Sequence, residues 1–462
     1  MFDVKKQKDS FMKSTLRNML GLVLLMGLSA QASSSDLLSR STFLGLVPET
    51  TDPKEKVVIS DLHPSGSAHS LGLKVGDIIV EVNEQNIDNF SSLISVLNDI
   101  DEGHQLSVDV IREGKALNLS ATAKGRPKES GEGYQVQYGA MKWQQELIRT
   151  ISYYPEKPRK DGAAVFFIQG YTCDSIDYGM MPDISLNQLL GGFAKKGFTV
   201  MKMEKPGVGD SEGQLDCSQY DFNLENSAFK AGLAHLKNQS KINPENVFVF
   251  GHSLGVLHAA EIANQGLAKG VIGYGGVLKS WHEYLQDIYA KQSVMYWGVS
   301  KEQAKQNVKL VKPFLADWLT TNKSWQKVLS SPANKAAIDA NILPLDDELI
   351  FHRHFSFFRS VNNIDFEALW RNGKAHSLML HGNYDIQAIE GQWADQIAEL
   401  TSANKPFTGS SIFFERTDHS LMQYKNKEDL MKVTRRQAQG LGHYNQEITT
   451  ASLAWMEKVL ML

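Results

Sequence analysis

Nine residues near the middle of this 462-residue chain carry its clearest structural signal: Val247-Phe248-Val249-Phe250-Gly251-His252-Ser253-Leu254-Gly255. A short apolar strand runs directly into Gly-x-Ser-x-Gly, and apolar residues at helical spacing follow it. A strand that turns sharply into a helix at such a serine is the local structure of a nucleophile elbow, which exposes the hydroxyl. The pattern predicts Ser253 as a nucleophile. The alternative is a tight strand-to-helix turn without chemistry.

Strands and helices alternate on both sides of this elbow. A predicted hairpin covers 134–154, and apolar strands are predicted at 163–168, 198–201, 271–274, 378–380 and 411–414. Predicted helices cover 186–196 and 223–238, and a third follows Ser253. Near-continuous apolar strands between helices are typical of a mostly parallel sheet covered on both faces. The predicted fold class is therefore α/β, doubly wound, over residues 134–462.

A serine hydroxyl needs a base, and the base needs an orienting acid. For this type of sheet the expected chain order is Ser, then Asp or Glu, then His. Asp385 follows the predicted strand at 378–380, and His419 follows the strand at 411–414. Because the carboxyl ends of parallel strands face the ligand crevice, the predicted triad is Ser253, Asp385 and His419.

Other residues compete for these roles or suggest a metal. Asp418 is an alternative acid, and Ser211 in Gly-Asp-Ser is an alternative nucleophile. No carboxylate or cysteine pattern completes a metal site around the His-x-His pair. We predict no metal and no cofactor. Four other histidines are interpreted as structural or non-ligating: His252, His381, His352, His354.

The oxyanion of an acyl-transfer intermediate needs preorganised N–H donors. The residue after the nucleophile supplies one of them, which is the backbone N–H of Leu254. The loop Gln169-Gly170-Tyr171 follows another predicted strand, and its glycine permits close backbone approach. We predict the N–H of Tyr171 as the second donor.

The alternation of predicted strands and helices stops between about 280 and 372, where aromatic and charged residues recur at helical spacing. This stretch is predicted to be a helical cap inserted before the strand that carries Asp385. Its aromatic residues either line an acyl pocket that excludes water or pack the cap onto the body of the domain.

From Tyr134 to Leu462 the chain resembles the α/β-hydrolase superfamily, particularly exported, PDZ-linked members of esterase or thioesterase type. The resemblance rests on Ser253, Asp385, His419 and the loop at 169–171; the glycine-rich loop 205–213 matches the family pattern in part. It implies acyl-enzyme hydrolysis of a small-molecule carboxylic ester or thioester. The alternatives are peptide or amide hydrolysis and a non-catalytic, PDZ-based binding protein.

Residues 43–123 form a second module, with short β-branched runs, turn signals and one helical stretch. It resembles bacterial PDZ domains through Phe43-Leu44-Gly45-Leu46, Pro64-Ser65-Gly66-Ser67-Ala68 and Gly76-Asp77-Ile78-Ile79. The resemblance implies a small α+β domain whose residues Phe43, Leu44, Gly45 and Leu46 receive the carboxylate of a peptide C-terminus by strand addition. The alternative is a purely structural module. A polar, Gly- and Pro-rich stretch at 124–133 is the predicted linker.

The N-terminus predicts export. Lys13 and Arg17 precede a short apolar run and a small-residue cleavage site, so residues 1–32 are predicted to be a signal peptide. The run is too short to cross a bilayer, so we expect no stable span after cleavage and a periplasmic or secreted protein. In an oxidising compartment Cys173 and Cys217 are predicted to form a disulfide; the alternative is two buried thiols. A net charge of −4 without a basic block gives no reason to expect a nucleic-acid partner.

Overall fold

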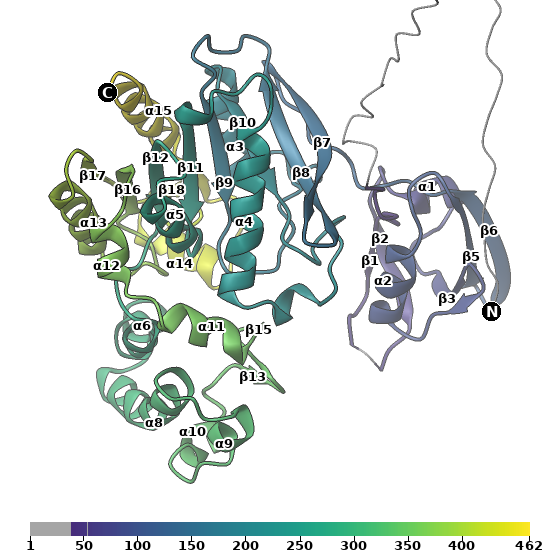
Figure 1. The fold of residues 1–462 in the computed structure, drawn as a ribbon. Helices are drawn as coiled ribbons and strands as arrows, with labels where there is room; N and C mark the ends of the chain where they lie inside the picture. The colour runs from purple at the N-terminus through teal and green to yellow at the C-terminus, as the bar shows by residue number, and fades with distance from the viewer. Residues whose placement is uncertain (1–37, 53) are drawn as a thin grey trace, which may run out of the picture. The chain divides into compact units, whose positions relative to one another are not determined.

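The computed structural model describes residues 38–52 and 54–462, so the predicted signal peptide lies outside the described residues. Its largest sheet has eight strands (Figure 1). From one edge to the other these are β17 (Gly409–Phe414), β16 (His376–Gly382), β12 (Gly270–Tyr274), β11 (Val247–His252), β9 (Ala164–Ile168), β10 (Thr199–Met203), β8 (Glu146–Pro155) and β7 (Tyr134–Trp143).

Neighbouring strands of this sheet are parallel except at β8, which is antiparallel to both β7 and β10. The chain places β9 between β11 and β10, so the strand order reverses there and opens a crevice at the carboxyl ends. This is the strand arrangement of an α/β-hydrolase fold. The predicted fold class is confirmed.

Helices cover both faces of the sheet, and each face has its own apolar core. On one face lie α3 (Ser185–Lys195) and α15 (Gln446–Leu460), whose Phe193 and Met456 are fully buried. On the other lie α4 (Phe222–Lys237), α5 (Gly255–Asn264) and α13 (Gln392–Ala403). All five residues of β9 are buried, as expected for a central strand with helices on both sides.

The insertion between β12 and β16 is mainly helical, as the sequence predicts. Its helices are α6 (Trp281–Asp287), η4 (Ile288–Gln292), α7 (Ser293–Trp297), α8 (Lys301–Leu319), α9 (Trp325–Leu329), α10 (Lys335–Asp339), α11 (Phe355–Asn362) and α12 (Phe366–Arg371). It also contains a small sheet that the sequence analysis did not predict. The strands of this sheet are β13 (Leu345–Asp346), β14 (Leu349–Ile350) and β15 (Arg353–His354), each too short to show an alternating pattern.

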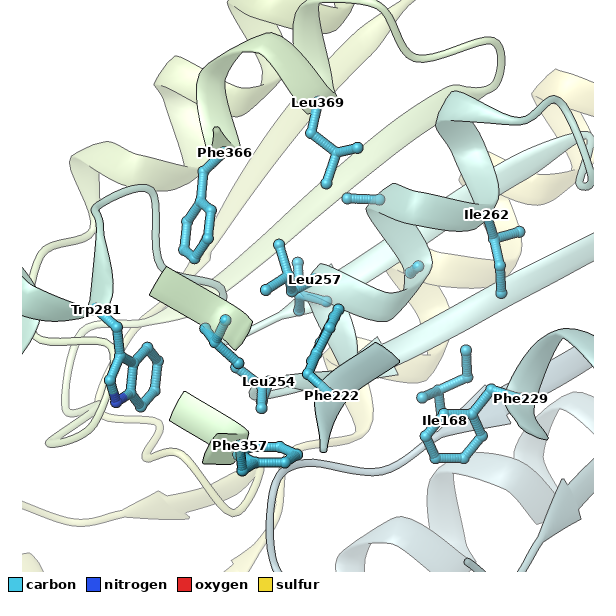
Figure 2. Packing of buried hydrophobic residues seen from close by; sticks show 14 of the residues in the cluster. Ile168, Phe222, Phe229, Leu254, Leu257, Ile262, Trp281, Phe357, Phe366 and Leu369 are labelled. Atoms are coloured by element: carbon cyan, nitrogen blue, oxygen red, sulfur yellow. The ribbon is translucent and has the colours of Figure 1, made fainter. Parts of the chain in front are cut away.

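The start of α5 is held in place by apolar side chains from several elements. Figure 2 shows Leu254 and Leu257 among Phe222 of α4, Phe357 of α11 and Phe366 of α12. Phe222 and Phe357 are fully buried. Because the insertion and the body of the domain share this core, the turn at Ser253 has rigid support from both.

The N-terminal module has a separate core and its own sheet. Its strands are β1 (Leu46–Pro48), β2 (Val57–Leu62), β3 (Ile78–Val82), β4 (Gln85–Asn86), β5 (Gln105–Arg112) and β6 (Lys115–Thr122), and its helices are α1 (Ser67–Leu71) and α2 (Phe90–Asn98). Strand β1 lies at the edge of the sheet. An edge strand has unpaired backbone groups that a further strand can use.

The rest of the described chain consists of short elements: η2 (Cys217–Gln219), η3 (Pro244–Asn246), β18 (Met422–Tyr424), α14 (Lys427–Thr434) and β19 (Gly442–Tyr444). Among the helices of residues 38–52 and 54–462, none combines the length and the apolar character needed to cross a bilayer.

Candidate active site

Ser253 lies at the sharp turn between β11 and α5. Its φ of +57° is in the left-handed region, which a serine adopts only when its surroundings impose it. The flanking glycines are required by space: a Cβ at Gly251 would lie 2.4 Å from the Gly255 carbonyl oxygen, and one at Gly255 would lie 2.3 Å from that of Ile168. The N–H of Ser253 donates to the carbonyl of Tyr274 at 2.9 Å. The strained turn is thus tied directly to the neighbouring strand.

Asp385 and His419 follow the neighbouring strands β16 and β17, and the fold brings them together. His419 Nδ1 lies 2.8 Å from Asp385 Oδ2. The other carboxylate oxygen, Oδ1, accepts hydrogen bonds from the backbone N–H groups of Gln387 and Ala388, both at 2.8 Å. Asp385 is buried and fully satisfied, so its side chain has one fixed orientation.

The charges of this pair support each other. Burial raises the pKa of Asp385, but His419, His381 and the N–H of Gln387 together outweigh burial, so the pKa falls below its usual value. Burial lowers the pKa of His419, and Asp385 reverses this and raises the pKa above its usual value. An ionised carboxylate on Nδ1–H leaves Nε2 as the imidazole nitrogen that can accept a proton.

Ser253 and His419 border the same cavity, but within the described residues the Ser253 hydroxyl forms no hydrogen bond to the imidazole. Hydrogen bonds of this type are often long without substrate and tighten on binding. The structure therefore shows the Asp385–His419 contact in place, without a hydrogen bond from Ser253.

His252 and Gly275 fix the position of His419. His252 Nε2 donates to the His419 carbonyl at 2.8 Å, and burial, followed by the nearby His419, lowers the pKa of His252 to about 4. His252 is therefore a neutral donor, in line with its structural interpretation. A Cβ at Gly275 would lie 2.7 Å from His419 Cε1 and 3.0 Å from Asp385 Oδ2, so only glycine leaves room for the pair.

Asp418 is turned away from the imidazole. Its Oδ1 accepts hydrogen bonds from the N–H groups of Ser420 and Met422, both at 2.9 Å, and its Oδ2 accepts one from the Tyr424 hydroxyl at 2.9 Å. These contacts stabilise the turn that carries His419. Asp385, which contacts Nδ1 directly, is the better candidate for the acid.

The two predicted oxyanion donors both lie close to Ser253. The backbone N–H groups of Leu254 and Tyr171 donate no hydrogen bond within the described part of the chain. Both residues border the cavity at Ser253. A Cβ at Gly170 would lie 3.0 Å from Ser253 Cβ, so the loop that carries Tyr171 packs directly against Ser253.

A cavity of about 810 Å³ opens beside Ser253. This volume is within the usual range for small-molecule sites. Its walls come from the loop after β9 and from the insertion, and they are mainly apolar. The apolar lining side chains are Ile176, Met180, Met181, Ile184, Leu186, Leu254, Trp281, Tyr284, Leu285, Ile288, Phe351 and Phe358. The aromatic residues of the insertion divide between two positions: some line the cavity, and others, such as Trp318 and Trp325, are buried in the packing of the insertion.

Two features around the cavity involve the flanking segments. Cys173 and Cys217 form a disulfide that joins the loop after β9 to η2. Arg126 and Pro127, in the predicted linker, also line the cavity. Glu129 in the same linker is buried and pairs with Lys202 at 2.7 Å. These contacts could not be predicted from the sequence, because a Gly- and Pro-rich polar stretch has the same composition whether it is exposed or anchored.

A group of buried charged or titratable side chains that the sequence did not predict lies behind the Tyr171 loop: Lys205, Glu225, His258 and Arg353. Glu225 receives hydrogen bonds or ion pairs from the other three at 2.9–3.2 Å. The partial match of the loop at 205–213 to the hydrolase pattern was a weak signal for Lys205. Nothing in the sequence marked Arg353, which comes from the insertion.

Comparison with known proteins identifies the N-terminal module. A family model described as PDZ domain matches residues 27–122. Among curated proteins, the chain is 32% identical over 83 residues to a probable periplasmic serine endoprotease DegP-like of Halomonas elongata, and 32% identical over 77 residues to protease RseP of Yersinia pestis. These matches cover 18% and 17% of this chain, and 18% and 16% of the relatives, so the chain matches less than a fifth of the relatives' length.

Among solved structures, the chain is similar to Est1E from Butyrivibrio proteoclasticus, with 11% identity and a TM-score of 0.42 over 70% of this chain and 99% of that one. It is also similar to a thioesterase domain from the curacin biosynthetic pathway, with 13% identity and a TM-score of 0.36 over 62% of this chain and 95% of that one. The fold assignment rests on the strand order of the chain itself.

Proposed function

We propose that this chain, a PDZ domain followed by an α/β-hydrolase fold, is an exported serine hydrolase that cleaves a carboxylic ester or thioester. The observation that carries the proposal is the convergence of Ser253 in a strained elbow, the Asp385–His419 pair and two free backbone N–H donors on one apolar cavity. Each part has one chemical role, and together they supply the groups that acyl transfer requires.

In the proposed mechanism, Ser253 Oγ attacks the substrate carbonyl carbon and its proton passes to His419 Nε2. The carbonyl oxygen becomes an oxyanion that accepts hydrogen bonds from the N–H groups of Leu254 and Tyr171. The intermediate collapses, the carbon–oxygen or carbon–sulfur bond breaks, and the alcohol or thiol leaves with the proton from His419. Water, activated by His419, then releases the acid and restores the Ser253 hydroxyl.

The apolar lining of the cavity favours a substrate with an apolar acyl group over one with a charged acyl group. Its apolar walls reach from the nucleophile to Met180 and Met181, whose side chains are partly exposed. Burial of each methylene contributes about 0.8 kcal/mol, so a chain that follows these walls gains affinity with length. The substrate is therefore proposed to be a small molecule with an apolar acyl chain.

The PDZ domain is proposed to dock a partner or substrate through a peptide C-terminus. The backbone N–H groups of Leu44 and Gly45 donate no hydrogen bond within the described residues, and β1 is an edge strand. This combination provides donors for a carboxylate and an open edge for strand addition. Export is proposed from the signal-peptide pattern and fits the disulfide between Cys173 and Cys217.

The test is fluorophosphonate labelling of the protein purified after expression of the full chain, with intact mass and site mapping. We expect one adduct, on Ser253, and none in Ser253→Ala. Ser211→Ala is the matched control: Ser211 Oγ accepts the N–H of Arg149 at 2.9 Å, and labelling should be unchanged. Absence of an adduct in folded protein would refute the proposal. Acyl esters, acyl thioesters and peptides then separate the substrate classes.

A further inference from the structure

Four charged or titratable side chains lie behind the Gly170–Tyr171 loop, and none of them lines the cavity. We call them the charge cluster: Lys205 after β10, Glu225 and His258 in α4 and α5, and Arg353 in β15. All four are at most 1% exposed. Burial of so many charges is costly unless each is paired, so their arrangement calls for a reason beyond packing.

The charge cluster holds two cations against one carboxylate. Glu225 pairs with Lys205 and with Arg353, each at 2.9 Å. Burial lowers the pKa of His258, so this imidazole is neutral and adds no third positive charge. The surplus positive charge is directed at backbone carbonyls instead.

Those carbonyls belong to the Gly170–Tyr171 loop, which we call the oxyanion loop because it carries the proposed donor. Lys205 Nζ donates to the Gly170 carbonyl at 2.7 Å, and Arg353 Nη1 donates to the Tyr171 carbonyl at 2.6 Å. The two carbonyls flank the Tyr171 residue on both sides along the chain. Hydrogen bonds from charged donors are roughly twice as strong as neutral ones, so the loop is clamped at both of its peptide groups.

The clamp at Gly170 also sets the direction of the proposed oxyanion donor. The carbonyl of Gly170 and the N–H of Tyr171 belong to one peptide group. In the described residues the cis peptide bond is Lys405–Pro406, so this group is trans and its N–H points opposite to its carbonyl. Because the carbonyl faces Lys205 behind the loop, the N–H faces forward, to the side where Gly170 abuts Ser253.

A cation on the carbonyl oxygen also polarises the same peptide group. Chains of hydrogen bonds in a low-dielectric interior strengthen one another, so a protonated amine on the Gly170 oxygen makes the Tyr171 N–H a better donor. Burial lowers the pKa of Lys205 to about 8, and Glu225 opposes that fall while Arg353 adds to it. Lys205 is thus protonated at neutral pH. The charged groups that act on it are Glu225, Arg353 and Asp174.

We propose that Lys205 and Arg353, joined through Glu225, are positioning residues that hold and polarise the Gly170–Tyr171 peptide as the second oxyanion donor. The inference rests on the proposed hydrolase function. It gives the insertion a second role, because Arg353 links β15 to the oxyanion loop in the body of the domain.

The first variant is Lys205→Met. It leaves Glu225 paired with Arg353, so no uncompensated buried charge results. Complete removal of one oxyanion donor costs about 10²–10³-fold in kcat, and weakening a donor should cost less. We expect kcat for an acyl ester to fall roughly 10–100-fold with KM within about threefold, because the donor acts in the transition state. Affinity for a trifluoromethyl ketone, which forms a tetrahedral adduct, should fall by a similar factor.

Lys202→Met is the matched control. Lys202 lies on β10, is 1% exposed, and pairs with Glu129 at 2.7 Å, but it donates to the Ile176 carbonyl rather than to the oxyanion loop. Its loss leaves Glu129 without its cation, so this variant should lose at least as much stability while kcat stays within about threefold.

The outcomes separate this inference from the proposed function. If folded Lys205→Met has the kcat of the wild type, the inference is overturned. If the wild type is labelled at Ser253 and hydrolyses the ester, the proposed function stands. Wild type that neither labels at Ser253 nor turns over refutes both. If Lys205→Met does not fold, Arg353→Lys is measured instead, since a lysine keeps the charge but cannot bridge Tyr171, Tyr220 and Glu225 at once. A fall in kcat at constant KM then supports the inference, and unchanged kcat overturns it.

Discussion

Gly275→Ala tests the Asp385–His419 geometry without altering either residue. A Cβ at Gly275 would lie 2.7 Å from His419 Cε1 and 2.8 Å from Nδ1, against about 3.4 Å for an ordinary contact. The imidazole must therefore move by roughly 0.7 Å, which stretches a hydrogen bond of 2.8 Å to Asp385 to a length where such bonds are weak. A misplacement of about 1 Å can cost 10²-fold, so we expect kcat to fall by about that factor.

Gly275 has a φ of +69°, so part of the effect on stability comes from the backbone alone. Alanine in the left-handed region costs about 1–2 kcal/mol. Gly266→Ala is the control, because Gly266 has a φ of +67° and its nearest neighbour, Lys374 Cβ, would lie at an ordinary 3.5 Å. Both variants should lose that free energy of unfolding in urea titrations, and ester hydrolysis should fall in Gly275→Ala alone. Equal kcat in the two folded variants would refute the assigned geometry.

Three further predictions concern pH, the disulfide and the cavity. The pKa of His419 is raised above 6.5 and its neutral form is the base, so kcat/KM of the wild type should fall in acid with a midpoint above pH 6.5. In pH–rate profiles, Asp385→Asn should shift this midpoint to lower pH and reduce kcat about 10⁴-fold. Reduction of the Cys173–Cys217 disulfide, whose cysteines are 44 residues apart, should lower the free energy of unfolding by about 4 kcal/mol in urea titrations with and without reductant. In a p-nitrophenyl ester series, kcat/KM should rise from acetyl to octanoyl by at most about fourfold per methylene; a flat series would contradict an apolar acyl site.

Local patterns made the fold and the sharp turn at Ser253 predictable. The strand, turn and helix of the elbow are contiguous in sequence, and steric exclusion at Gly251 and Gly255 operates over a few residues. Asp385 and His419 were predictable for a related reason. Each follows an apolar strand, and a parallel sheet gathers the carboxyl ends of its strands at one edge. Periodicity and chain order therefore suffice for these parts.

The surroundings of the site depend on contacts that leave no local pattern. Arg353 reaches the Tyr171 carbonyl across 182 residues of sequence, and its strand, β15, has two residues. Glu129 is buried beside Lys202 although its own segment has the composition of an exposed linker. A charged residue is placed in the interior by the partner that compensates its burial, and that partner comes from elsewhere in the chain. For this reason the backbone framework and the turn at Ser253 followed from sequence, whereas the contacts that hold the Gly170–Tyr171 loop required the folded chain.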